Sequence, residues 1–153
     1  MAKTYRVTPV LRIVNIIVTT MLRLGVPLND VWLLTVEGRK TGTPYTIPIT
    51  LIIKGEQRWL VAPYGPVSWV RNLRAASEAV LSRGGHHERI VVQELKAHDA
   101  APILKQYLQK ISVVRPYFDV TYESPLPAIE AEAAQHPVFL VTESTKLQGK
   151  KGW

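Results

Sequence analysis

Short turns, rather than crossover helices, connect the strand-like segments of this chain, and this spacing constrains its fold more than any other feature. Segments rich in β-branched and aromatic residues predict six strands, which span residues 31–36, 45–53, 58–62, 78–83, 87–95 and 136–142. Turns at Gly55 and at Gly84-Gly85 predict two antiparallel hairpins. Because parallel strands require long crossover connections, the sequence favours a mostly antiparallel sheet closed into a small barrel over a doubly wound sheet.

Four helical segments accompany these strands and place the chain in the α+β class. They span residues 10–24, 68–76, 99–112 and 126–134. Ser68 is the predicted N-cap of the second helix, and Pro102 is expected in the first turn of the third. Pro48 marks an edge or a bulge in its strand, because proline cannot donate a ladder hydrogen bond.

The length and composition predict one domain. The 153 residues, of which 46% are hydrophobic and 20% charged, are enough for one well-buried core and too few to suggest two. We therefore expect a single domain over residues 1–153. It would comprise a helical segment at residues 1–27 and a six-stranded antiparallel barrel with flanking helices at residues 28–153.

The segment at residues 10–24 is very apolar, yet its pattern predicts an amphipathic helix. Its polar residues recur at steps of three or four positions and so share one stripe: Arg12, Asn15, Thr19 and Arg23. The apolar stretch between the arginines is shorter than the ~20 residues that cross a bilayer. We expect this helix to pack on the body of the domain; the alternative is peripheral contact with a membrane or a lipid-like substrate through residues 10–24.

The charge of the chain indicates the kind of partner it binds. The formal net charge of +7 favours anionic partners, which include nucleic acid, a membrane face and a phosphorylated cofactor. The chain has no cysteine, which excludes disulfides, thiolate nucleophiles and cysteine metal sites. The same absence fits a reducing cytoplasm, so we expect a cytoplasmic protein, with membrane association through the amino-terminal helix as the alternative.

A glycine-bracketed pair of cations lies between the first two predicted strands. Gly38 and Gly42 let the loop turn tightly and direct its amides at a ligand, while Arg39 and Lys40 add positive charge. The loop is therefore suited to an anion. The alternative is a hairpin connection whose basic side chains are simply solvated. The spacing matches neither a Walker loop nor a dinucleotide-binding fingerprint.

Conventional catalytic groups are missing from the sequence. His86 and His87 are neighbours on a strand, so their side chains diverge, and the other two histidines are far away in the sequence. Glu130 and Glu132 lie two positions apart on a helix and do not face one site. These patterns predict no metal site and disfavour hydrolase chemistry. An enzyme of this kind would take its reactivity from a bound cofactor.

A second group of residues is suited to a flat ring. Residues 61–66 end the third strand with small and rigid residues, and a helix begins at Ser68. Small residues allow a planar ring to approach the backbone, and the helix start offers unpaired amides. Trp69 and Asn72 would add contacts. The alternative is a surface helix with Trp69 buried in the core.

Two motifs, together with their separation in the sequence, resemble those of the deazaflavin-dependent nitroreductase family of actinobacteria. They are residues 33–44, Leu-Leu-Thr-Val-Glu-Gly-Arg-Lys-Thr-Gly-Thr-Pro, followed by Pro48, and the later Trp69, Asn72 and Leu73. The resemblance extends from about Leu33 to Leu81. It implies a split β-barrel, FMN-binding-like in fold, that binds coenzyme F420, an 8-hydroxy-5-deazaflavin with a phosphate and an oligoglutamate tail. The cofactor-binding residues that it implies are Arg39, Lys40, Thr41, Gly42, Pro48, Ala62, Pro63, Tyr64, Gly65, Trp69 and Asn72.

The resemblance also implies a reaction. An F420-dependent oxidoreductase would transfer hydride from reduced deazaflavin to a hydrophobic, electron-poor acceptor such as a quinone, an enone or another activated double bond, with nitro compounds as incidental substrates. Tyr117 and Tyr122 are the candidate catalytic residues, because a phenol can donate a proton to the reduced substrate. Both tyrosines could instead fill the core. The sequence departs from the family at Pro63-Tyr64-Gly65-Pro66, where a Gly-Gly pair and a lysine are common.

Two other classes of function remain open at the level of sequence. One is a split barrel that binds FMN, or that holds a cofactor or lipid without catalysis. The other is a basic barrel that binds nucleic acid, which ranks well behind because the aromatic residues are poorly interleaved with lysine and arginine. We therefore expect a small hydrophobic substrate and no nucleic acid as partners. Related barrels often dimerise, which makes a homodimer a further expectation.

Overall fold

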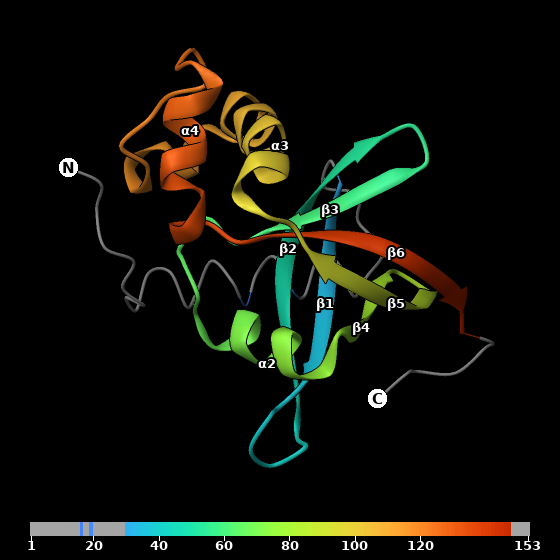
Figure 1. The fold of residues 1–153 in the computed structure, drawn as a ribbon. Helices are drawn as coiled ribbons and strands as arrows, with labels where there is room; N and C mark the ends of the chain where they lie inside the picture. The colour runs from blue at the N-terminus through green and yellow to red at the C-terminus, as the bar shows by residue number, and fades with distance from the viewer. Residues whose placement is uncertain (1–15, 17–18, 20–29, 148–153) are drawn as a thin grey trace.

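Six antiparallel strands close into a barrel in this computed structural model, which describes residues 16, 19 and 30–147 (Figure 1). Their order around the barrel is β1-β2-β3-β6-β5-β4. The strands are β1 Val31–Glu37, β2 Pro44–Lys54, β3 Gln57–Val61, β4 Glu78–Arg83, β5 His86–Glu94 and β6 Val138–Lys146. The predicted fold class and the two predicted hairpins, β2–β3 and β4–β5, are confirmed.

Strand β2 pairs with two different strands along its length. Residues 44–50 of β2 pair with β1, and residues 51–54 pair with β3. Strand β1 also pairs with β4, for example at Leu34 opposite Leu81, which closes the barrel. Pro48 pairs with Leu33 in the part of β2 that has no β3 partner, so its missing N–H is tolerated there. The predicted edge position of Pro48 is thus correct.

The helices lie outside the barrel. They are α2 Ser68–Ala76, α3 Ala97–Lys110 and α4 Leu126–Glu132, with 3-10 turns η1 Ser112–Tyr117 and η2 Ala133–Gln135. Two details of the sequence prediction were wrong. The N-cap of α2 is Val67 and not Ser68, because Val67 holds the last extended backbone conformation and no side chain caps the helix. Helix α3 begins at Ala97, since the Lys96 carbonyl accepts the first helical bonds, and Pro102 therefore lies in the second turn.

Two hydrophobic cores follow from the alternation of side chains along the strands. Leu51 and its inward-facing neighbours fill the barrel interior, and Val70 and Leu73 of α2 join this core. Ile52, one position along, belongs instead to a second core between the barrel and helices α3 and α4, where Leu104 is fully buried. The two cores fix α2 and the α3–α4 pair on different sides of the barrel (Figure 1).

The predicted amino-terminal helix at residues 10–24 lies outside the described residues, apart from Ile16 and Thr19, which are both helical. Among the helices that the structure describes, none combines the length and the apolar character that a membrane crossing requires.

A cationic pocket between the β1–β2 loop and helix α2

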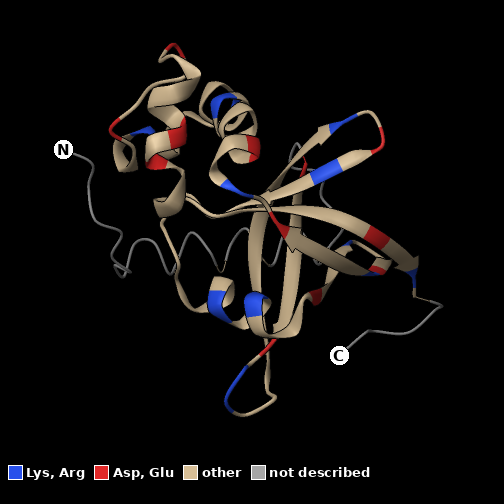
Figure 2. Cartoon of the chain, viewed as in Figure 1, with Lys and Arg blue, Asp and Glu red and all other residues tan. Residues whose placement is uncertain are grey.

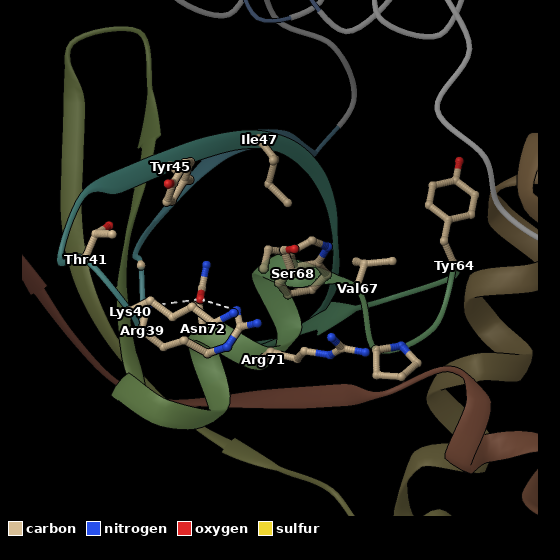
Figure 3. A pocket seen from close by; sticks show the side chains of 13 residues that line it. Arg39, Lys40, Thr41, Tyr45, Ile47, Tyr64, Val67, Ser68, Arg71 and Asn72 are labelled. Atoms are coloured by element: carbon tan, nitrogen blue, oxygen red, sulfur yellow. Dashed lines mark hydrogen bonds between the residues drawn. The ribbon is translucent and has the colours of Figure 1, made fainter.

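A pocket of about 980 Å³ opens between the β1–β2 loop and the start of α2 (Figure 3). Its lining combines basic, polar and aromatic side chains and contains no aspartate or glutamate. The lining residues are Gly38, Arg39, Lys40, Thr41, Tyr45, Ile47, Tyr64, Pro66, Val67, Ser68, Trp69, Arg71 and Asn72. The volume lies within the range of roughly 300–1,000 Å³ that is typical of small-molecule and cofactor sites.

The two glycines of the β1–β2 loop close it in different ways. The Gly38 N–H donates to the Thr43 carbonyl and the Gly42 N–H donates to the Gly38 carbonyl, both at 2.8 Å. Gly42 has φ +76°, a backbone conformation that favours glycine. Gly38 is required for space, because a Cβ there would lie 2.8 Å from Cε2 of Tyr45 and 3.0 Å from the Thr43 carbonyl oxygen. The loop thus turns tightly, as predicted, and carries its cations at the tip.

A side-chain contact attaches this loop to α2. The backbone N–H of Arg39 and its guanidinium Nη1 both donate to Oδ1 of Asn72, at 3.1 and 2.7 Å. Asn72 is only 5% exposed. Because both donors require the amide oxygen, the amide orientation is fixed and the Asn72 NH₂ group points into the pocket (Figure 3). Asn72 therefore both positions the loop and offers a hydrogen-bond donor to a ligand.

The pocket has an excess of positive charge. Arg39, Lys40 and Arg71 line it, and within the described part of the chain none of them forms an ion pair with a carboxylate. Arg74, one turn along α2, differs, since it forms a bidentate pair with Glu94 at 2.7 and 2.8 Å, which raises the pKa of Arg74. Figure 2 shows the basic residues gathered on the loop and on α2. The uncapped start of α2 adjoins the pocket and adds the positive end of its dipole.

Three aromatic side chains, Tyr45, Tyr64 and Trp69, also belong to the lining. Tyr45 is 53% exposed and lies on β2, and Trp69 packs partly against the barrel core, with its ring centroid 6.3 Å from that of Phe139. Tyr64 meets Tyr117 edge to face, with centroids 4.8 Å apart. A flat apolar ligand would find contacts here that the basic side of the pocket does not offer.

The structure brings six of the predicted site residues together in this lining. They are Arg39, Lys40, Thr41, Tyr64, Trp69 and Asn72. The others lie outside it: Gly42, Pro48, Ala62, Pro63, Gly65, Tyr117 and Tyr122. Tyr117 is next to the pocket through Tyr64, whereas Tyr122 lies under the Arg115 guanidinium, 5.0 Å from its ring centroid. The catalytic and binding roles of all these residues stay predictions.

Ala62, Pro63 and Gly65, unlike Tyr64, do not line the pocket, and their backbone contacts explain why. The Ala62 N–H donates to the Pro137 carbonyl, the Pro63 carbonyl accepts from His136, and Gly65 lies against Gln135. These backbone groups are used to attach the loop to the chain before β6. They are therefore not directed at a ligand in the pocket.

Sequence reasoning missed several lining residues, of which Tyr45 and Ile47 were within reach. They follow the glycine loop at alternate positions of a predicted strand, so they share one face. Arg71 is a further lining residue that is not among the predicted cofactor-binding residues. Its place one turn after Ser68 puts it on the side of α2 that borders the pocket.

A split barrel with a basic, partly aromatic pocket defines a class of proteins that bind planar cofactors with anionic tails. The sequence model of the F420H(2)-dependent quinone reductase family matches residues 10–125. The chain belongs to this family. It is an oxidoreductase that uses coenzyme F420, and the resemblance seen in the sequence is confirmed.

Solved structures share the fold. An F420-H2-dependent reductase superposes with a TM-score of 0.50 at 20% identity, covering 73% of this chain and 93% of that one. A domain-swapped dimer gives a TM-score of 0.54 at 18% identity and covers 88% and 99%. A protein of unknown function from Agrobacterium tumefaciens gives 0.55 at 10% identity and covers 95% of this chain and 62% of that one. No curated protein matches the chain.

The lining of the pocket fits F420. The cofactor carries a phosphate and carboxylates, and the pocket offers Lys40 and Arg71 without competing carboxylates among the described residues. The ring of the cofactor is flat and bears polar edges, and the pocket offers Trp69, Tyr45 and the free NH₂ group of Asn72. The charge and the shape of the site therefore agree with the family.

Proposed function

We propose that this F420-dependent reductase reduces a hydrophobic, electron-poor small molecule, such as a quinone, an enone or another activated double bond. The observation that carries the proposal is that one pocket combines basic and aromatic side chains. We call Arg39, Lys40 and Arg71 its basic side and Tyr45, Tyr64 and Trp69 its aromatic side. The basic side suits the anionic part of the cofactor, and the aromatic side suits the ring and an apolar acceptor. Nitro compounds would be incidental substrates of the same site.

The basic side would hold the phosphate and the tail. Lys40 and Arg71 would contact these anions, because neither is engaged by a carboxylate in the described residues. Arg39 would act in two ways, since its guanidinium also holds Asn72. The hydroxyl of Thr41 lies at the same loop tip and accepts the Thr43 N–H at 3.2 Å. Charged hydrogen bonds of this kind are the stronger ones in proteins.

The aromatic side would hold the deazaflavin ring and the acceptor. Asn72 would donate to a polar edge of the ring, and Trp69 would lie along it. When bound, the reduced cofactor supplies the hydride. The contribution of the chain is to bring acceptor and cofactor together and to exclude water from them. Tyr45 and Tyr64 line the pocket, and Tyr117, the predicted proton donor, meets the Tyr64 ring edge to face.

Fluorescence titration with F420 tests the cofactor site. We expect Arg71→Ala to weaken F420 binding by about tenfold, since one charged contact is worth about 1.4 kcal/mol of binding. Arg74→Ala is the matched control, because Arg74 lies on the same helix but is paired with Glu94 and does not line the pocket. Equal losses in the two variants would contradict the assignment. Tighter binding of FMN than of F420 would favour the FMN-binding alternative.

The acceptor is tested with the cofactor-loaded protein. Reduction of a soluble quinone should exceed reduction of a charged, polar acceptor, because only the former gains from the aromatic side of the pocket. Oxidation of F420H2 is followed by the return of the deazaflavin absorbance. An equal preference for both acceptors would leave the reductase assignment standing and remove the proposed acceptor class.

A homodimer is the second part of the proposal. Its support is the domain-swapped dimer among the structures of this fold. Sedimentation equilibrium of the full chain at several concentrations measures the assembly directly. A monomer at every concentration would exclude it.

A further inference from the structure

The pocket is lined from two sides that differ in chemistry (Figure 3). Tyr45 and Ile47 project into it from strand β2, and Ser68 and Asn72 project into it from helix α2 on the opposite side. We call the pair Tyr45 and Ile47 the β2 wall. All the basic side chains of the lining belong to the β1–β2 loop or to α2. The only polar side-chain group of the β2 wall is the Tyr45 hydroxyl.

The alternation of β2 produces this wall. Tyr45 and Ile47 are two positions apart, so their side chains leave the strand on the same face. Thr46, between them, directs its hydroxyl away from the pocket to that of Thr35, at 2.8 Å. Ile47 also packs against the core of the barrel. The β2 wall is therefore a continuation of the sheet and not a mobile loop.

The ring of Tyr45 is held in place and yet largely uncovered. A Cβ on Gly38 would lie 2.8 Å from its Cε2, so the missing side chain at Gly38 lets the ring rest close to the loop backbone. The residue is nevertheless 53% exposed, and it is the aromatic one among the exposed large hydrophobic residues that the structure describes. A positioned, uncovered ring offers a flat apolar surface to a ligand in the pocket.

The two sides suit different ligands. Lys40, Arg71 and the NH₂ group of Asn72 lie on the side of the loop and α2, so a polar, anionic cofactor gains its hydrogen bonds and ion pairs there. Trp69, also on α2, adds an aromatic contact on that side. An uncharged acceptor gains nothing from these cations. Because hydride transfer requires the acceptor to lie against the cofactor ring, the β2 wall is the surface that remains for it.

We propose that Tyr45 is a specificity-determining residue for the acceptor: its ring packs on the face of a planar aromatic acceptor and selects aromatic quinones over non-aromatic enones. The inference rests on the proposed function and narrows its acceptor class. In the reaction, a quinone takes a hydride from the reduced cofactor and a proton from water and becomes a hydroquinone. An enone takes the same hydride and proton and becomes the saturated ketone.

Two variants of Tyr45 separate its ring from its hydroxyl. Tyr45→Leu keeps an apolar side chain without a ring, whereas Tyr45→Phe keeps the ring without the hydroxyl. Ile53→Ala is the matched control, because Ile53 also lies on β2 and is 37% exposed but does not line the pocket. The probes are a naphthoquinone and a cyclohexenone, both uncharged. The chain has no cysteine, so no thiol of the protein consumes either probe.

Steady-state kinetics with F420H2 compare each acceptor with itself in the wild type. Tyr45→Leu should raise the KM for the naphthoquinone about fivefold with little change in kcat, since an aromatic contact of this kind is lost. The KM for the cyclohexenone should change less than about twofold. Tyr45→Phe and Ile53→Ala should behave like the wild type with both acceptors. Equal changes for the two acceptors in Tyr45→Leu would overturn the proposal.

Binding measurements give a readout without turnover. In protein saturated with oxidised F420, calorimetric titration should show about fivefold weaker naphthoquinone binding in Tyr45→Leu and no change in Tyr45→Phe. Fluorescence titration should give the same F420 affinity, and melting the same stability, in all variants. Weaker F420 binding in Tyr45→Leu with an unchanged quinone affinity would overturn the proposal and assign Tyr45 to the cofactor.

The same measurements distinguish this inference from the proposed function. If the wild type binds F420 but reduces neither acceptor, the proposed function fails, and the calorimetric titration still decides whether the Tyr45 ring binds the quinone. If both acceptors are reduced and Tyr45→Leu leaves the naphthoquinone KM and affinity unchanged, the proposed function stands and this inference fails. A wild type that does not bind F420 would overturn both.

Discussion

The two ends of the barrel differ in whether their charged side chains are paired within the protein. At the end where β1, β3 and β5 begin, Glu88 is 6% exposed and accepts from Arg58 at 2.5 Å, from His86 at 2.8 Å and from Ser144 at 2.6 Å. At the other end, Lys40 and Arg71 line the pocket without a carboxylate partner in the described residues. The first end compensates its charges internally, whereas the second leaves positive charge for a ligand.

The difference shows how a small barrel divides stability from function. A buried ion such as Glu88 is tolerated only when partners replace the water it has lost. Cations at a pocket rim keep part of their hydration, so the fold can leave them unpaired at little cost. The unpaired charge therefore marks the functional end. Variants at the two ends should separate losses of stability from losses of binding.

The largest expected effect is the loss of stability in Glu88→Gln. Burial alone would raise the pKa of Glu88, but hydrogen bonds from Arg58, Ser144 and His86 outweigh it and lower the pKa from 4.5 to about 2. The variant leaves Arg58 without its countercharge, which should cost about 3 kcal/mol of unfolding free energy. F420 binding at low temperature should be unchanged. Denaturant unfolding at neutral pH measures the loss, and a cost below about 1 kcal/mol would show that this end is not held by charge.

The pH dependence of stability gives a second test of the contribution of Glu88. Since the pKa of Glu88 is lowered on folding, its contribution is present above 4.5 and is lost as the pH falls towards 2. Acid titration of the unfolding free energy should therefore fall less steeply in Glu88→Gln than in wild type. Glu94→Gln is the control, because its partner Arg74 is on the surface, and the change should be at most about 1 kcal/mol.

The second largest effect is expected for Gly38→Ala at the functional end. A Cβ at Gly38 would lie 2.8 Å from the Tyr45 ring and 3.0 Å from the Thr43 backbone oxygen, and the backbone cannot move aside cheaply. We expect a loss of about 1–3 kcal/mol of stability together with weaker F420 binding, because the loop carries Arg39 and Lys40. Thermal melting and F420 titration measure both.

Gly85→Ala is the matched control for this loop. Gly85 also lies in a hairpin turn, but nothing is within 4 Å of the added Cβ. The variant should melt and bind like the wild type. If Gly38→Ala also leaves the melting temperature and F420 affinity unchanged, the tight β1–β2 loop is not required to position Arg39 and Lys40.

The architecture was within reach of the sequence because its signals are local. Gly55 and Gly84 mark turns with positive φ, and the hairpins they join were placed within one residue at most ends. Helix α2 was predicted with its observed bounds. The strand β6 was predicted to begin two residues too early and to end four residues too early, at residue 142, because its second half is exposed and polar and has no apolar alternation to reveal it. The 3-10 helix at residues 112–117 was missed, since six residues are too few to give a periodic pattern.

The site was predicted only in part, because the residues that face the pocket depend on which polar groups already form hydrogen bonds within the protein. The sequence identifies Arg39 and Asn72 as binding residues but cannot show that they bind each other. Likewise Pro63 lies in a loop suited to a ring, yet its carbonyl is taken by His136, which is 73 positions away. Such long-range contacts have no signature in local composition. They decide which predicted residues face the pocket.

A smaller effect should distinguish the two cations of the β1–β2 loop. Lys40→Ala should weaken F420 binding by about tenfold and leave the melting temperature unchanged, because Lys40 is exposed and contacts no carboxylate in the described residues. Arg39→Ala should weaken binding and also lower stability by about 1 kcal/mol, since it releases Asn72. Calorimetric melting with F420 titration measures both. Identical behaviour of the two variants would contradict the separate roles assigned here.

The smallest effect is the response to salt, and it compares the two ends directly. Raising the ionic strength from about 0.05 to about 0.5 M shortens the Debye length from roughly 14 to 4 Å, which should weaken F420 binding a few-fold at the hydrated pocket. The stability difference between wild type and Glu88→Gln should hardly change, because buried pairs are screened much less. The opposite result would be an F420 affinity that does not change with salt and a stability loss in Glu88→Gln that does. It would contradict the roles assigned to charge at the two ends of the barrel. It would mean that the pocket binds its ligand through the aromatic side, and that Lys40 and Arg71 contribute little to the binding free energy.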